Sequence, residues 1–277
     1  MSFKVKNIIK VSDEIIEKIL EKYADDEYFA MDKIIPIQPE LEIYMGSNTE
    51  ESILYAISKK NDEELNLLQK KLQETIKPKT YVEEKESKLD YLLGYLWRGD
   101  LKGKISNLFD LKKYISSENL KELENYAKSY KPFWWEEELG INKLEDLGNT
   151  YLNNIINYDA MCAAHWCSKF WGSTGMTIIY EHKNNELILE TEWATPIGII
   201  DKLSKEFPNT IFSVEFASNG DDSCGKYEIK NGELISYMDL EELDIMRIWD
   251  YTIDGKNNEN EQQINNEYDD EWEDEMY

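Results

Sequence analysis

Apolar and polar residues alternate in short stretches near both ends of the chain, a pattern that predicts β-strands. Phe3 to Val11 begins with this alternation and then merges into an apolar run. Apolar residues next recur at helical spacing from Ile15 to Tyr23, after Ser12 or Asp13 as the N-cap. Phe29 to Ile37, which ends in a proline-rich stretch, predicts a second extended segment. We therefore expect the chain to open with a β-α-β unit.

The middle of the chain, residues 47–150, follows a helical pattern instead. It is rich in Leu, Lys, Glu and Tyr, and its apolar residues recur at i, i+3 and i+4. This spacing predicts a helical insertion of four to six helices. They are expected over Glu50 to Ser58, Asp62 to Ile76, Lys85 to Leu96, Leu108 to Ile115 and Glu118 to Tyr130. Ser116-Ser117-Glu118 predicts the start of the last of these, and Lys131-Pro132 its end.

Mixed structure is predicted to resume after Gly148. A helix is expected over Thr150 to Phe170, and Pro196 favours the first turn of another helix that runs to Phe207. Asn184-Asn185 and Asn231-Gly232 predict tight hairpin turns. The expected strands are Met176 to Tyr180, Glu186 to Trp193, Ile211 to Ala217, Cys224 to Lys230 and Glu233 to Met238, followed by a short acidic helix over Asp239 to Asp250.

Four segments resemble, in order, the motifs of one known family. They are K-I-I-P-I at Lys33 to Ile37, W-C-S-K-F-W-G-S-T-G-M at Trp166 to Met176, the stretch from Thr191 to Asn209, and C-G-K-Y-E-I-K-N-G-E at Cys224 to Glu233. Their sequence is similar to the YubB-type ferredoxin-like domain of phage and plasmid proteins. The resemblance covers residues 1–40 and 150–240. It implies a split β-α-β sheet and an origin in a mobile genetic element, and it carries over no catalytic residues.

The patterns and the resemblance together predict an α+β fold. The expected architecture is a ferredoxin-like split β-α-β antiparallel sheet with a large helical insertion and an acidic C-terminal tail. Residues 1–46 and 150–250 would form a discontinuous ferredoxin-like domain, residues 47–149 the helical insertion, and residues 251–277 the tail.

Charge narrows the classes of partner. The 57 acidic residues outnumber the 31 basic ones and leave a net charge of −26. Asp254 to Tyr277 contributes −9 of this, so residues 1–253 still carry −17. A surface this negative repels nucleic-acid phosphates and anionic membranes, and attracts basic proteins. The densest basic stretches, Lys102-Gly103-Lys104 and Lys112-Lys113, are too short to reverse that repulsion. Direct nucleic-acid binding is therefore excluded from the expected functions.

Aromatic residues stand next to carboxylates at two places in the chain. In the tail, the carboxylates could mimic phosphates and the aromatics bases, or the segment could simply aid solubility. In the insertion, Phe133-Trp134-Trp135 precedes three glutamates, and it could anchor the insertion on the main domain or face a partner. The candidate partner-binding residues are Tyr268, Asp269, Asp270, Glu271, Trp272, Glu273, Asp274, Glu275, Trp134 and Trp135.

Residues that could carry chemistry are few. The three cysteines predict no disulfide framework. Cys162, His165 and Cys167, with Cys224 as a fourth ligand, have zinc-like spacing, but helix positions five apart diverge by about 140°. Asp221-Asp222 could bind a divalent cation or simply form a turn. No phosphate-binding loop or Ser-His-Asp set is present in the sequence. We therefore expect no catalytic residues, no metal and no cofactor.

The sequence shows neither a signal peptide nor an apolar run long enough for a membrane span, so we expect a cytoplasmic protein in a host cell. The expected function is that of a non-enzymatic phage or mobile-element protein. It would bind and inhibit a basic host protein, such as a CRISPR or other defence nuclease, through an acidic surface that mimics nucleic acid. A metal-dependent enzyme and a self-associating accessory protein are the alternatives.

Overall fold

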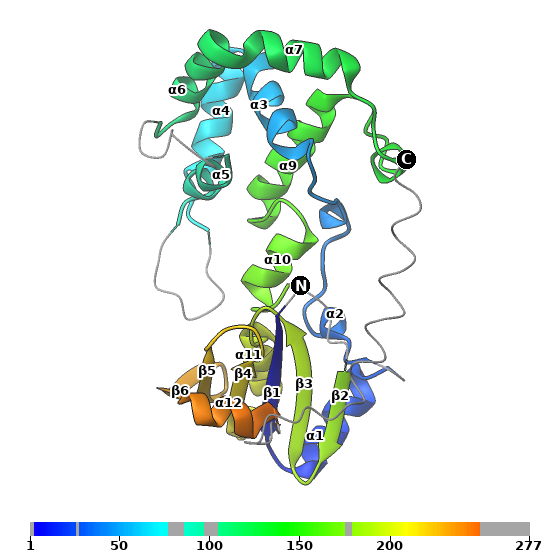
Figure 1. Cartoon of the computed structure of the whole chain (residues 1–277), viewed down its shortest axis with the longest axis vertical. Coiled ribbons are helices and arrows are strands. Elements are labelled where there is room, and N and C mark those ends of the chain that lie inside the picture. The colour runs from blue at the N-terminus through cyan, green and yellow to red at the C-terminus, as the bar shows by residue number, and fades with distance from the viewer. Residues whose placement is uncertain (1–2, 26–27, 77–85, 97–104, 175–178, 250–277) are drawn as a thin grey trace.

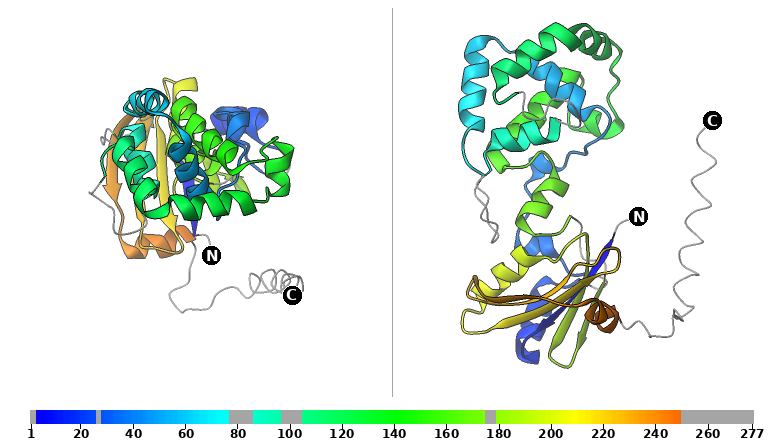
Figure 2. Two further views of the ribbon diagram at one scale, coloured as in Figure 1. Left: turned by 90° about the horizontal axis from the view of Figure 1, so that it is seen from above. Right: turned by 60° about the vertical axis from the view of Figure 1, so that its left-hand side comes forward.

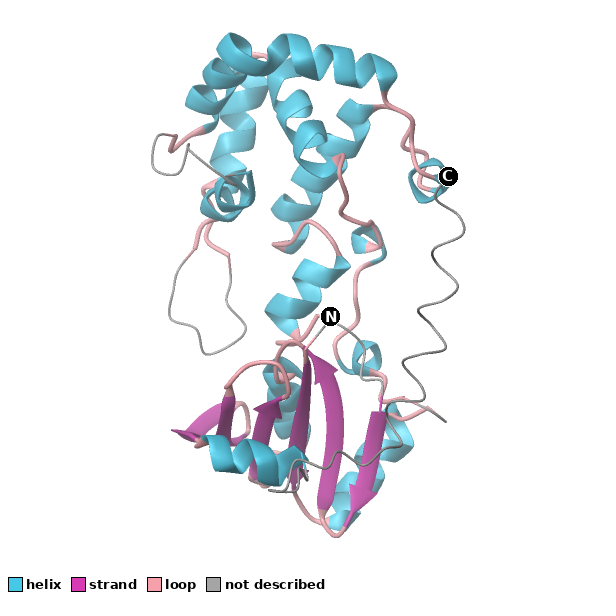
Figure 3. Cartoon of the chain, in the orientation of Figure 1, coloured by secondary structure: helices cyan, strands magenta, loops and turns pink. Residues whose placement is uncertain are grey.

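A sheet body and a helical body make up the part of the chain that the structure describes (Figure 1). The computed structural model describes residues 3–25, 28–76, 86–96, 105–174 and 179–249. The sheet body lies at the lower end of the view and the helical body at the upper end (Figures 1 and 3). None of the helices in these described ranges is long and apolar enough to cross a membrane.

Six antiparallel strands form the sheet, in the order β2-β3-β1-β4-β5-β6. Their bounds are β1 Lys4–Lys10, β2 Ile179–Lys183, β3 Glu186–Glu192, β4 Phe212–Ser218, β5 Cys224–Lys230 and β6 Glu233–Asp239. Strands β3 and β4 both run antiparallel to β1, which lies between them, and α11 (Ile197–Glu206) connects them. This is a split β-α-β unit. With α1 (Asp13–Tyr23) it completes a ferredoxin-like fold, which β5 and β6 extend on one side.

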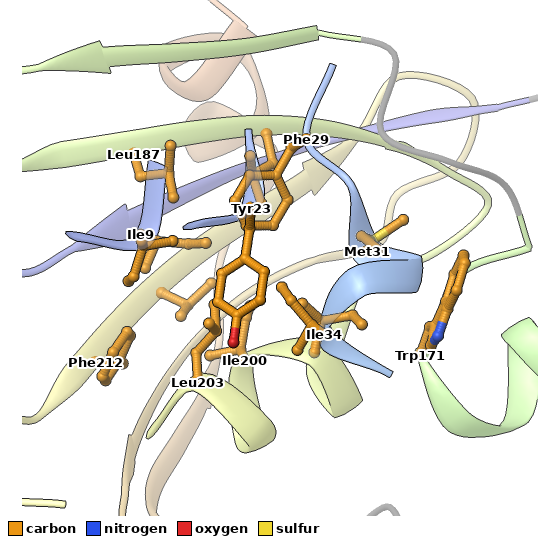
Figure 4. Packing of buried hydrophobic residues seen from close by; sticks show 14 of the residues in the cluster. Ile9, Tyr23, Phe29, Met31, Ile34, Trp171, Leu187, Ile200, Leu203 and Phe212 are labelled. Atoms are coloured by element: carbon orange, nitrogen blue, oxygen red, sulfur yellow. The ribbon is translucent and has the colours of Figure 1, made fainter. Parts of the chain in front are cut away.

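The larger core covers one face of the sheet, beneath α1, α2 (Met31–Ile34) and α11 (Figure 4). Alternation along β3 buries Leu187, Leu189 and Thr191 while the residues between them stay half-buried. Helix α1 contributes residues at helical spacing, among them Ile16 and Ile19. Each fully buried side chain of this size contributes about 1.5–3 kcal/mol. Figure 4 shows Ile9, Tyr23, Phe29, Met31, Leu203 and Phe212 meeting between these elements.

Helix α12 (Glu242–Trp249) packs on the other face of the sheet. Ile248 is buried there against Ala217 and Cys224. The indole nitrogen of Trp249 donates to the carbonyl of Ala217 at 3.0 Å. The carboxylate of Glu215 accepts from Arg247 at 3.0 Å and so links the helix to β4. A small second core and one buried carboxylate therefore hold α12 in place.

The helical body has a core of its own, drawn from residues 43–162. Its elements are α3 Thr49–Lys59, α4 Asp62–Leu72, α5 Lys88–Leu96, α6 Leu108–Tyr114, the π-helical segment η2 Ile115–Asn119, α7 Leu120–Ser129, α8 Trp134–Glu138 and α9 Leu144–Tyr158. Helices α3 and α9 approach each other closely at Gly148, where a Cβ would lie 2.0 Å from the carbonyl oxygen of Ser52. The short helices η1 (Pro39–Leu41) and α10 (Ala163–Phe170) lie where the chain enters and leaves this body.

The predicted strand over Phe29 to Ile37 is wrong. This segment contains helix α2, whose Met31 and Ile34 are buried at i, i+3 spacing. Both positions beside the central strand β1 are occupied by β3 and β4, so the segment has no place next to that strand. Pro36 also lacks the N–H that a sheet ladder needs.

Two other predictions need correction. The single helix over Thr150 to Phe170 is interrupted, because α9 ends at Tyr158 and Asp159 adopts a left-handed backbone with φ 61°. Ser116 and Ser117 do not start a helix, since they lie in the π-helical segment that joins α6 directly to α7. The strand predictions for β4, β5 and β6 are confirmed within a residue, and both hairpin turns have the expected positive φ at their asparagines.

The domain boundaries drawn from the sequence stay predictions. In the structure, the buried α9 residues of the helical core lie between Leu147 and Ile155, and its last two members are Met161 and Cys162. The sheet core resumes at Ala160 and Trp166. The cores therefore overlap in sequence over Ala160 to Cys162, directly before α10.

Candidate protein-binding surface

Helix α8 is held at its start by one buried carboxylate. Glu136, 1% exposed, accepts from the backbone N–H of Phe133 at 2.6 Å and from the hydroxyl of Tyr130 at 2.7 Å. Burial and this carboxylate together raise the pKa of the Tyr130 hydroxyl, which therefore remains a donor at neutral pH. These two bonds fix the turn after Pro132, and so they fix the direction of the side chains that follow.

The turn and helix present aromatic residues to solvent. Trp134 is 67% exposed and Phe133 is 47% exposed. Trp135 stacks on Phe133 with ring centroids 6.2 Å apart and meets Tyr44 edge-on at 5.6 Å. Trp135 also packs against the helical core. The structure thus separates two predicted partner-binding residues: Trp135 anchors α8 within the insertion, and Trp134 points outward.

Carboxylates and a leucine surround these rings. Glu137 and Glu138 are exposed on α8, and Leu139 directly after it is 49% exposed. We call this set the α8 surface; it comprises Tyr44, Phe133, Trp134, Trp135, Glu137, Glu138 and Leu139. Aromatic faces attract ammonium and guanidinium groups, and nearby carboxylates pair with them. The α8 surface is therefore suited to Lys and Arg side chains.

The other predicted partner-binding residues, Tyr268 to Glu275, lie outside the described residues, and the structure does not test them.

A cavity of about 780 Å³ lies beside the α8 surface and shares Tyr44 with it. The segment from Glu42 to Ser47 forms one side, and Tyr95, Cys162 and the first turn of α10 form the other. His165 lines it and bonds through Nδ1 to the hydroxyl of Tyr91 at 2.5 Å. The cavity thus lies where the chain passes from one core to the other.

Burial favours the neutral forms of His165 and Cys162 at this cavity. Burial, with a smaller effect of Lys169, lowers the pKa of His165. Burial also raises the pKa of the Cys162 thiol, and it raises the pKa of Cys167 to about 12. A neutral imidazole beside a protonated, buried thiol is not an activated nucleophile.

The zinc-like spacing in the sequence does not bring its residues together. Cys162 belongs to the helical core, Cys167 to the sheet core, and Cys224 to the small core beneath α12. Within the described ranges, no three His, Cys, Asp or Glu side chains are grouped as metal ligands. Asp221 accepts from the backbone N–H of Ser223 at 3.0 Å. This bond is typical of a turn, which was one of the two interpretations of Asp221-Asp222.

Comparison with known proteins adds to the description of the sheet. Residues 175–264 match the family model of the ferredoxin-like domain in Api92-like proteins. The match covers about a third of the chain and takes in β2 to β6, α11 and α12. It supports a ferredoxin-like family without distinguishing the YubB type.

A crystal structure of the protein Api92 from Yersinia pseudotuberculosis is also similar, with 10% identity and a TM-score of 0.34. That alignment covers 86% of this chain and 97% of the Api92 chain. No curated protein matches the sequence.

Two features of the α8 surface were missed in the sequence. Tyr44 lies about ninety residues before Trp135, and no pattern connects them. The role of Glu136 had a signal, because it stands three residues after Phe133, as an N3 glutamate does in a capping box. Three glutamates follow one another here, and the sequence does not indicate that only the first of them is buried.

Proposed function

We propose that this protein is a non-enzymatic binding protein that inhibits a basic partner through its acidic, aromatic surface. The observation that carries the proposal is Trp134, 67% exposed on a helix whose start is held by a buried glutamate. Glu137 and Glu138 stand beside it on a chain of net charge −26. Tryptophan exposed in a fixed position is common at the centre of protein interfaces.

The partner we propose is a host nucleic-acid-binding protein, most specifically a CRISPR or other defence nuclease. Such enzymes hold nucleic acid on basic surfaces, and carboxylates with aromatic rings can occupy those surfaces in place of phosphates and bases. The ordered motifs between Lys33 and Glu233 support a YubB-type origin in a phage or plasmid. With that origin we propose that the protein acts in the host cytoplasm.

The test is affinity capture from host lysate by the full chain, with elution by rising salt. We expect a basic protein to stay bound at low salt and to elute as ionic strength screens the charges. Trp134→Ala should weaken the captured complex by roughly 2 kcal/mol, about thirty-fold in Kd.

The matched control is Leu67→Ala, which removes an apolar side chain 57% exposed on α4. It should leave the affinity unchanged. If both variants bound the captured partner as tightly as the parent chain, the α8 surface would not be the binding surface. Deletion of Asp254 to Tyr277 separates the contribution of the tail, which carries −9 of the net charge. An interaction that does not respond to salt would contradict the electrostatic basis altogether.

A further inference from the structure

Strand β6 leaves one edge of the sheet open and apolar. It is the last strand in the order β2-β3-β1-β4-β5-β6, and within the described ranges it pairs only with β5. Ile235 is 51% exposed, and Tyr237 and Met238 are each 55% exposed. Leu243, just beyond the strand, is 71% exposed. Four large apolar side chains are thus exposed within nine residues.

An edge strand offers backbone N–H and C=O groups to any further strand, and proteins usually protect such edges. β6 has the sequence E-L-I-S-Y-M-D, with no proline, lysine or arginine. The opposite edge strand, β2, reads I-Y-E-H-K and carries charged residues along its length. The register shift between Glu228 and Ile229 places an extra residue on β6 itself, because Glu228 pairs with Ser236 and Ile229 with Leu234. Ile235 therefore forms a bulge, which interrupts the edge at one position.

The charges around β6 have a single sign. Residues 231–246 contain five carboxylates and no Lys or Arg. They are Glu233, Asp239, Glu241, Glu242 and Asp244. Among the described residues, only Asp244 of these five has an ion pair, with Arg247 at 3.2 Å. A second copy of the chain would bring the same carboxylates against themselves, because a two-fold interface pairs identical surfaces. A basic segment would meet complementary charge instead.

We propose that β6 binds an extended basic segment of the partner as a seventh strand of the sheet. Backbone hydrogen bonds would supply the alignment, the exposed apolar residues would contact alternate side chains, and the carboxylates would pair with Lys or Arg. The inference rests on the proposed function only in taking the partner to be basic. It concerns a separate surface, because β6 belongs to the sheet body and α8 to the helical body at the other end (Figures 1 and 2).

The test uses the full chain, labelled with ¹⁵N, and a blocked eight-residue peptide in which Lys and Val alternate. We expect the peptide to shift the amide signals of residues 233–239. A peptide of the same sequence with alternate backbone nitrogens methylated keeps the charge but loses hydrogen-bond donors on one edge. It should bind at least about tenfold more weakly. A Glu-Val peptide should not bind.

Ile235→Lys is the test variant, since the side chain is half exposed and a lysine on an edge opposes both strand pairing and basic ligands. We expect it to weaken the Lys-Val peptide about tenfold. Leu67→Lys makes the same change of charge on α4 and should alter the affinity about twofold at most.

Several results would overturn the proposal. Equal weakening by both variants, or no effect of backbone methylation, would show attraction by net charge alone. Shifts confined to the α8 surface would disprove the β6 site and leave the proposed function standing. The absence of any binding by the Lys-Val peptide would also disprove the β6 site, while capture from lysate would test the proposed function independently. A concentration-dependent dimer abolished by Ile235→Lys would assign the edge to a second copy.

Discussion

Glu215 connects three basic side chains of the sheet body. On β4 it is only 7% exposed, yet it lies 3.0 Å from Arg247, 3.3 Å from Lys10 and 3.7 Å from Lys226. Burial alone would raise the pKa of this carboxyl, but the bonds to Arg247 and Lys10 outweigh that effect and lower it. The ionised form is therefore favoured by folding.

Replacing this carboxylate should loosen α12. We expect Glu215→Gln to lower the free energy of unfolding by about 1–3 kcal/mol at pH 7, because it leaves Arg247 and Lys10 without their charged acceptor. A depressed pKa contributes stability that is complete above the unfolded value and is lost as pH falls through the folded value. The difference between the variant and the parent chain should therefore shrink below about pH 4.

Urea unfolding at several pH values measures this difference. Glu17→Gln, at an exposed site on α1, is the control and should cost almost nothing. A deficit of the same size at pH 3 and pH 7 would contradict the ionic explanation.

At the scale of elements, the closest approach between helices depends on one glycine. A Cβ at position 148 would meet the carbonyl oxygen of Ser52 at 2.0 Å and the side chain of Ala56 at 2.8 Å. Because the first of these is backbone, α3 and α9 must move apart to accept it. We expect Gly148→Ala to destabilise the helical body by about 1–3 kcal/mol, although alanine favours a helix intrinsically.

Gly94 on α5 provides a matched control, since nothing lies within 4 Å of a Cβ built there. Gly94→Ala should raise the melting temperature, because it keeps the helical gain of up to about 1 kcal/mol without a clash. If both substitutions stabilised the protein, that result would contradict the close approach of α3 and α9 at position 148.

Elements with a clear local pattern were predictable from the sequence. The helices from Thr49 to Ser129 and strands β3 to β6 follow hydrophobic periodicity, and Asn231-Gly232 specifies its turn chemically. The segment around α2 was not predictable, because its short apolar run fits a strand or a helix. The occupied positions beside β1 decide between them, and those positions are filled by residues more than 150 places later.

The candidate surface was predictable only in part. Trp134 and Trp135 were both identified, but adjacent tryptophans on a helix point in different directions, and no sequence pattern said which of them is exposed. The exposed edge of β6 was also missed. Its residues resemble those of a half-buried strand, and only the strand order shows that no described strand lies beyond it.

At the scale of the whole molecule, the two large cores, of the sheet body and of the helical body, predict two separable unfolding transitions. The helical core and the sheet core share no buried residue. Asn154 on α9 provides one link between them, since its side chain donates to the carbonyl of Glu40 at 2.9 Å, next to Leu41 of the sheet core. We expect urea to unfold the two bodies in two steps, as is common when a chain has more than one core.

The variants described above can assign these steps. Gly148→Ala should shift only the transition of the helical body, and Glu215→Gln should shift only that of the sheet body. Far-ultraviolet circular dichroism and tryptophan fluorescence measure both transitions. Coincident shifts of one cooperative transition would show that the two bodies unfold as a unit.

The position of β1 has a consequence for how the protein is made. This central strand precedes the other strands of the sheet in the chain, yet the nearest residue with which it pairs is Glu186, and its other neighbour begins at Phe212. At a rate of synthesis of roughly 5–20 residues per second, roughly 10–35 s pass between the synthesis of β1 and that of its first partner strand. The helical core, complete by Cys162, can close during that interval. The insertion would then fold before the interrupted domain around it.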